Sequence, residues 1–181
     1  MIKIYKQNIK DLLEMIDYAI QSKKEMPSLI LLYSGIDIMA WLGRNDESDV
    51  NVYFKEWVKQ YLLPDSGLNC DENDLWGARC GIVHRFTAES NVTNSGVARQ
   101  IFYVSGTGKA EDLQKYLDRI FKKDKAIAVH INDLNSSFKI AIQRLDKMLS
   151  KKHSPMSKIV SERSNMYFTR IPESNRLDIK E

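Results

Sequence analysis

The sequence predicts a mainly helical protein, an up-and-down helical bundle that carries a small two-stranded β insertion before its last long helix. Apolar residues in the first half recur at spacings of three and four, which is the period of an α-helix. Two short runs rich in β-branched and aromatic residues occur only after residue 98, and a long amphipathic segment follows them. With 181 residues, the chain has the length of one compact domain.

Four helices are expected in the first half of the chain. Residues 7–23 form an amphipathic helix, and a second helix begins near Pro27 and ends at Gly43, before a polar run. A third helix covers residues 50–63 and stops at a proline. The acidic residues 71–74 suit the N-terminus of a fourth helix, because carboxylates are stabilised by the positive end of the helix dipole.

The second half changes in character. Residues 87–96 are expected to form a loop, and residues 98–106 and 125–131 to contain two strands. A short helix is expected between the strands at 111–123, and a long helix over 131–151.

These elements predict one helical domain with an appendage. The domain covers residues 1–151, and residues from about 98 to 131 are its strand-helix-strand insertion. Residues 152–181 form a polar C-terminal extension that we expect to be partly flexible.

Composition restricts the location and the partners of the protein. The net charge of +3 permits an RNA or phosphate partner, but it is smaller than that of a dedicated nucleic-acid binder. No secretory signal is visible and the longest apolar stretch, LILLYSGIDIMAWLG, is interrupted by Ser34 and Asp37, so we expect a buried helix, a cytoplasmic protein and no membrane. Cys70 and Cys80 are expected to be free thiols, although a disulfide between them is an alternative. No zinc-ligand spacing is present, and we expect neither a metal nor a cofactor.

Arg79 stands out because it falls within the apolar stripe of the fourth helix. That stripe consists of Leu75, Ala78, Ile82 and Phe86. A guanidinium in such a place costs several kcal/mol unless an anion meets it, with an effective penalty of that order per buried ion. Asp37, itself on an apolar helix, is the nearest candidate within the chain, and a bound phosphate is the other. The two roles are compatible.

His84 lies on another side of the same helix, about 140° from Arg79 on an ideal helix. Gly77 and Gly81 lie near this side and form a small-residue groove, where a second helix or a second subunit could approach. The alternative for His84 is a histidine that is merely hydrogen-bonded at a helix interface.

The segment RCGIVH at residues 79–84 resembles the R-x4-H motif of HEPN domains. The segment LILLYSGIDIMAWLG is similar to the helix that packs beside that motif, and the resemblance extends to the long helix near 132–150. It implies an all-helical up-and-down bundle that is commonly homodimeric, and in many members a metal-independent ribonuclease.

The resemblance also implies roles for individual residues. RNA carries its own nucleophile, the 2′-OH, so His84 would act as acid or base and Arg79 would hold the scissile phosphate. A dimer that brings two such segments together would supply both an acid and a base, and the groove at Gly77 and Gly81 agrees with such a contact. Active members often carry a polar residue directly after the arginine, where this chain has Cys80. A thiol orients a phosphate poorly, and this departure puts catalysis in question.

The leading hypothesis is therefore a metal-independent endoribonuclease, in a toxin–antitoxin or defence setting, with a protein antitoxin or partner. The alternative is a non-catalytic HEPN-type module that binds RNA, nucleotide or a protein. A third interpretation makes Arg79 and Asp37 purely structural and the chain an interaction scaffold.

Overall fold

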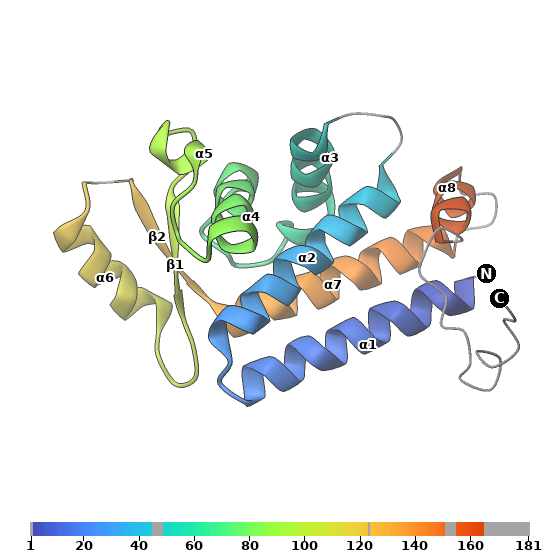
Figure 1. The fold of residues 1–181 in the computed structure, drawn as a ribbon, viewed down its shortest axis with the longest axis horizontal. Coiled ribbons are helices and arrows are strands. Elements are labelled where there is room, and N and C mark those ends of the chain that lie inside the picture. The colour runs from blue at the N-terminus through green and yellow to red at the C-terminus, as the bar shows by residue number, and fades with distance from the viewer. Residues whose placement is uncertain (1, 45–48, 123, 151–154, 165–181) are drawn as a thin grey trace, which may run out of the picture.

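The computed structural model describes residues 2–44, 49–122, 124–150 and 155–164. Most of these residues are helical, and a small parallel sheet lies at one end of the helices (Figure 1). The helices are α1 (Ile2–Gln21), α2 (Glu25–Gly43), α3 (Val50–Trp57), the π-helical η1 (Val58–Leu62), α4 (Glu72–Arg85), α5 (Asn91–Asn94), α6 (Ala110–Ile120), α7 (Ile131–Leu149) and α8 (Pro155–Ser164). The strands are β1 (Gln100–Val104) and β2 (Ala126–His130). The mainly helical class and the two strands match the prediction.

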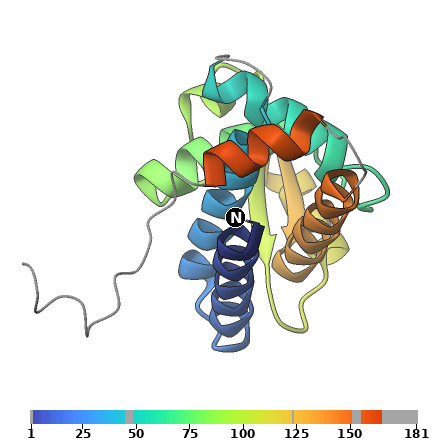
Figure 2. The ribbon, with the colours of Figure 1, turned by 90° about the vertical axis from the view of Figure 1, so that its right-hand side faces the viewer.

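Helix α2 is the centre of the molecule. It packs against α1 and α7 on one side and against α3 and α4 on the other, and α8 crosses its C-terminal end (Figures 1 and 2). In length and mean hydropathy, 1.4, it is the one described helix that could cross a membrane, but half of it is buried by the surrounding helices. Its apolar character therefore agrees with the predicted core helix.

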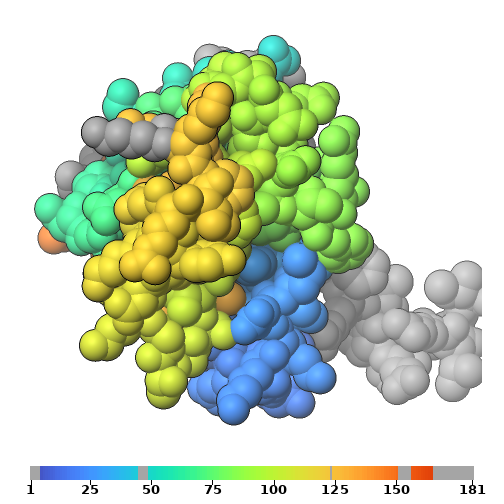
Figure 3. Space-filling model, turned by 90° about the vertical axis from the view of Figure 1, so that its left-hand side faces the viewer, coloured from blue at the N-terminus to red at the C-terminus, as the bar shows by residue number. Residues whose placement is uncertain are grey.

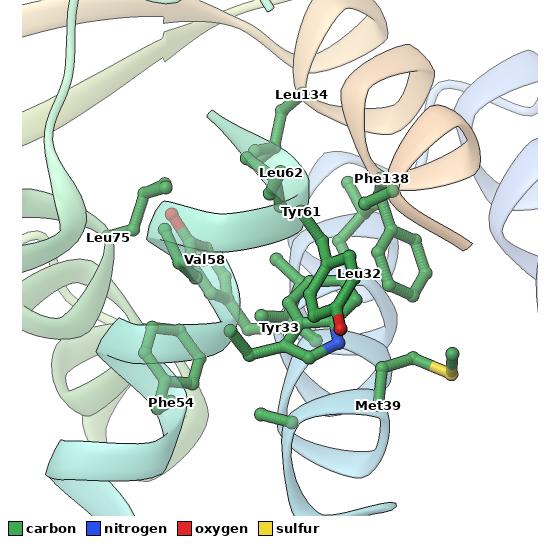
Figure 4. Close-up of a cluster of buried hydrophobic side chains, with 14 of the residues drawn as sticks. Leu32, Tyr33, Met39, Phe54, Val58, Tyr61, Leu62, Leu75, Leu134 and Phe138 are labelled. Carbon is green, nitrogen blue, oxygen red and sulfur yellow. The ribbon is translucent and has the colours of Figure 1, made fainter. Parts of the chain in front are cut away.

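The core forms where α2, α3, η1, α4 and α7 meet (Figure 4). Each large apolar side chain that is fully buried contributes about 1.5–3 kcal/mol of transfer free energy. The buried side chains labelled in Figure 4 include Leu32, Tyr33, Met39, Phe54, Val58, Leu62, Leu75, Leu134 and Phe138.

The predicted third helix is one helix in the sequence but two types of helix in the structure. After α3, the N–H of Leu63 donates to the carbonyl of Val58 at 2.9 Å, five residues earlier, which is the π-helical pattern. At the end of η1, Arg144 of α7 donates to the carbonyls of Tyr61 (2.9 Å) and Pro64 (2.6 Å). A long-range arginine thus stabilises a turn that local periodicity describes as ordinary helix.

The two strands are parallel, and α6 connects them. Pairing runs from Gln100 opposite Ala126 to Val104 opposite His130. The loop predicted at 87–96 contains a short helix, α5, because the side chains of Ser90 and Thr93 cap its first turn reciprocally. Figure 3 shows this end of the molecule, with α6 and β2 beside α4 and α5.

Helix α8 falls within the predicted extension, yet it packs against α1, α2 and α7. Arg163 of α8 donates to the carbonyls of Trp41 (2.9 Å) and Leu42 (3.1 Å), which caps the C-terminal end of α2. The predicted domain boundary, at residues 151–152, and residues 165–181 lie outside the described part of the chain.

Candidate functional site

Helix α4 carries the R-x4-H segment, and its first turn is fixed by a capping box. One carboxylate oxygen of Asp71 accepts from the N–H groups of Asn73 (2.8 Å) and Asp74 (2.9 Å), while Asp74 accepts from the N–H of Asp71 (3.1 Å). The start predicted from the acidic residues 71–74 therefore matches the structure.

Asp74 has a second role that sequence reasoning missed. Its buried carboxylate accepts from the backbone N–H of Arg99 at 2.7 Å and from its guanidinium at 3.0 and 2.5 Å. This pair ties the start of α4 to the residue before β1. No sequence signal links residues 25 positions apart, so only the tertiary fold identifies it.

Arg79 and Asp37 meet where α4 crosses α2. The guanidinium donates to one carboxylate oxygen of Asp37 through Nε at 2.7 Å and through Nη2 at 2.5 Å. Their side chains are only 15% and 20% exposed, respectively. The other oxygen of Asp37 is buried and has no hydrogen-bond partner among the described residues.

His84 also contacts Arg79, within the same chain. Nη1 of Arg79 lies 2.8 Å from Nε2 of His84, which is exposed. The two side chains meet although they start about 140° apart on an ideal helix. Helix α4 is continuous over this segment, so the contact comes from the length of the arginine side chain, which reaches along the helix to its last turn.

Trp76 completes the setting of Arg79. Its ring lies 5.2 Å from the guanidinium carbon of Arg79, a cation–π contact. The same ring packs on Phe54 of α3, with centroids 5.3 Å apart. Trp76 is half-buried, and its position one turn before Arg79 was the available sequence signal for this contact.

The charges at the site are strongly coupled. Burial raises the pKa of the Asp37 carboxyl, and the hydrogen bond and charge of Arg79 counteract part of that effect. Burial also disfavours the charge on Arg79, but Asp37 outweighs it and raises the pKa of the guanidinium. Because this carboxylate lies 2.5 Å from a permanent cation, the two form an ionised pair at neutral pH.

Both cysteines are free thiols, as predicted. Burial raises the pKa of Cys80, although Arg79 acts in the opposite direction. Burial and the nearby Asp74 raise the pKa of Cys70 to about 12. Each thiol is therefore protonated at neutral pH and unreactive.

The glycine groove is filled by the chain itself. A Cβ on Gly77 would lie 3.1 Å from side-chain atoms of Thr93 and Ala98. A Cβ on Gly81 would lie 2.5 Å from the carbonyl oxygen of Thr87 and 2.9 Å from that of Glu89. The glycines thus admit residues 87–98 of the same chain, and the expectation that the groove receives a second subunit loses its basis.

Phe86 differs from its predicted place in the apolar stripe. Leu75, Ala78 and Ile82 are buried as predicted, but Phe86 is 62% exposed. It stands at the C-terminal cap of α4 in the left-handed conformation, with φ 55° and ψ 34°. The chain reverses at this residue, so the helical spacing that predicted its burial no longer applies.

The larger cavities lie elsewhere. One of about 530 Å³ lies between the α1–α2 turn and the β1–α6 loop (Figure 3), and others of about 450 and 320 Å³ lie along α1 and α7 and beside Arg99. Neither Arg79 nor His84 lines these three. Within the described ranges, no group of three or more His, Cys, Asp or Glu side chains could hold a metal ion.

Comparison of the chain with protein-family models, with curated proteins and with solved structures gave no match.

Proposed function

We propose that this protein is a metal-independent endoribonuclease of HEPN type, with Arg79 and His84 in its active site. The observation that carries the proposal is the double engagement of Arg79. Asp37 holds one edge of its guanidinium, while Nη1 contacts an exposed histidine. A phosphate that binds Nη1 of Arg79 would therefore lie beside the imidazole of His84.

The chemistry follows from the donors and acceptors. A guanidinium only donates, so Nε2 of His84 accepts from Nη1 and the ring is neutral in this contact, with its proton assigned to Nδ1. A scissile phosphate that takes over the Nη1 donor frees Nε2 as a general base. Nε2 then removes the proton of the 2′-OH, the bond from O2′ to phosphorus forms, and the bond from phosphorus to O5′ breaks. Arg79 stabilises the negative charge that accumulates on the phosphoryl oxygens.

The leaving O5′ needs a proton, and one histidine does not conveniently serve as both base and acid. A homodimer would provide a second His84 for this step. Because residues 87–98 occupy the glycine face of α4, the two chains would approach through the exposed end of α4 instead. The proposal includes an up-and-down bundle of HEPN type, a cytoplasmic location, and a protein antitoxin or partner in a toxin–antitoxin or defence setting.

A non-catalytic HEPN-type module that binds RNA, nucleotide or a protein is the second candidate. Two observations favour it. The thiol that follows Arg79 is half-buried and protonated, and the ion pair with Asp37 gives Arg79 a structural role without any substrate.

Cleavage of mixed RNA in EDTA by the purified full chain distinguishes the two candidates. His84→Ala should lower the rate by about 10²–10⁴-fold, the usual contribution of a general acid or base. Arg79→Lys should also cut poorly while it keeps the charge beside Asp37, because a lysine lacks the planar fork of donors. Arg119→Ala, which removes an exposed positive charge from α6, is the matched control and should cut like the wild type.

Equal cleavage by the wild type and by both site variants would indicate a contaminating nuclease and would contradict the proposal. RNA binding by the wild type without cleavage would instead support the non-catalytic module.

A further inference from the structure

Phe86 occupies a position that normally favours glycine. Its N–H donates to the carbonyl of Ile82 at 3.2 Å, and the N–H of Thr87 donates to that of Gly81 at 3.4 Å. With φ at 55°, Phe86 occupies the position with left-handed conformation that ends many helices. Glycine or asparagine is usual at that position. A bulky aromatic residue is an outlier in this conformation.

The conformation turns the ring outward. In the described part of the chain, Phe86 is the one phenylalanine among the exposed large hydrophobic residues, and it is 62% exposed. Besides Phe86, three described residues that are not glycine have a positive φ, namely Lys23, Asp65 and Asp124. All three are polar, so Phe86 alone among them combines backbone strain with exposed aromatic surface. Neither feature helps the isolated chain to fold, which points to something that binds the ring.

The position of Phe86 relative to the proposed site suggests what binds. Phe86 follows His84 by two residues, a span of at most about 7 Å of chain. The residue between them, Arg85, is exposed and basic. The proposed phosphate site beside Arg79 and His84 is thus adjacent in the chain to a second cation and to an exposed aromatic ring. Nucleobases that are not paired stack on aromatic side chains, and this stacking tolerates any base.

We infer that Phe86 is a stacking platform for an unpaired nucleobase next to the scissile phosphate. This inference rests on the proposed function. A duplex would keep its bases stacked on one another and would not offer a free face to Phe86. A loop, a bulge or an unpaired end presents such a face.

The test compares substitutions that separate stacking from folding. Phe86→Tyr and Phe86→Trp keep the aromatic face, Phe86→Leu keeps only the apolar character, and Phe86→Gly removes the ring while it relieves the backbone strain. The probe is a short mixed-sequence single-stranded RNA with 2′-O-methyl groups, which cannot be cleaved by 2′-OH attack. Its Kd is measured for the full chain and each variant, beside a fully paired RNA of the same length.

Phe86→Gly and Phe86→Leu should bind the single strand about 5- to 150-fold more weakly, the range that corresponds to one stacked base. The Tyr and Trp variants should bind like the wild type, and the duplex should show no such difference. Phe86→Gly should also melt at a higher temperature than the wild type, so its weaker binding would not reflect a folding defect.

Equal binding of the single strand by all variants would overturn the inference. A change in the subunit number of Phe86→Gly, with unchanged RNA binding, would do the same and would identify Phe86 as a subunit contact. Because the probe cannot be cleaved, this assay is independent of catalysis. Phe86-dependent binding without any cleavage of natural RNA would support the stacking of a nucleobase on Phe86 and would refute the nuclease proposal.

Discussion

At the residue scale, Arg79 connects the interior of the molecule to its surface. Its guanidinium binds the half-buried carboxylate of Asp37, lies on the ring of Trp76 and reaches the exposed His84. The first two contacts offset the cost of removing the charge from water. They also fix the direction of the remaining N–H groups. The ion pair with Asp37 is therefore compatible with the proposed role of Arg79 in substrate binding.

Removal of the Asp37 charge should expose how strongly Arg79 depends on it. Asp37→Asn should lower the free energy of unfolding by about 1.5–3 kcal/mol, the range for hydrogen bonds to charged groups. In an Arg79→Met background the same substitution should cost much less, because no buried cation is left without a partner. Urea denaturation of the four proteins of this cycle measures the coupling. Asp112→Asn, on exposed α6, is the control and should change stability by less than about 0.5 kcal/mol. A coupling near zero would show that the pair adds nothing to the fold.

The sequence allowed part of this site to be predicted. Two charges on otherwise apolar helices, Asp37 and Arg79, indicated a pair because each needed a partner. The contact with His84 was not predictable from a helical wheel, which places Cα atoms and ignores the reach of a long side chain. The exposure of Phe86 depends on a chain reversal that the residues from Thr87 onward impose, and no apolar periodicity reports it.

At the scale of elements, α4 is held at both ends and along one face. Asp74 joins its first turn to Arg99, and the residues that follow its last turn fold back over Gly77 and Gly81. The glycines let this segment approach the helix backbone closely. Such support fixes the position of Arg79 and His84 without any contribution from a second chain.

A methyl group on the glycine face should disturb this support. Gly81→Ala places a Cβ 2.5 Å from the backbone oxygen of Thr87, so the returning segment must move. We expect a loss of roughly 1–3 kcal/mol in the free energy of unfolding, as for other overpacked sites. Gly43→Ala is the matched control, because its Cβ would meet only the edge of Trp57 at 3.5 Å, an ordinary contact. Thermal melts of both variants should show destabilisation at Gly81 and none at Gly43. A Gly81→Ala protein as stable as the wild type would mean that the segment yields easily.

The limits of element prediction are also specific. Periodicity located α1, α2, α4, α6 and α7 because each has a start or stop signal or a regular apolar face. It could not distinguish the π-helical η1 from the end of α3, because apolar spacing does not report a single wider turn. Arg144, some eighty residues away in the chain, donates to carbonyls at the end of this segment. It could not show that α8 packs on α2. Arg163 of α8 binds backbone carbonyl groups at the end of α2, and backbone groups leave no signal in the side-chain pattern.

At the scale of the whole molecule, α2 organises the fold. It is the apolar helix on which α1, α3, α4, α7 and α8 pack, and it also supplies Asp37 to the candidate site. The parallel strands lie beside α4 and contribute Ile101, Ile127 and Val129 to the main core, and α6 packs on the strands (Figure 1). Arg99, just before β1, pairs with Asp74 of α4. His84 and Arg85, in the last turn of α4, are exposed, and the proposed substrate would bind there.

Analysis of the RNA ends left by cleavage tests the roles of Arg79 and His84 most directly. Attack by the 2′-OH leaves a 2′,3′-cyclic phosphate on one fragment and a 5′-OH on the other, and it requires no metal. We therefore predict these ends in EDTA, identified by mass spectrometry, and no cleavage at a position where the substrate carries 2′-deoxyribose. Fragments with a 3′-OH and a 5′-phosphate, or equal cleavage at the 2′-deoxy position, would contradict the assignment.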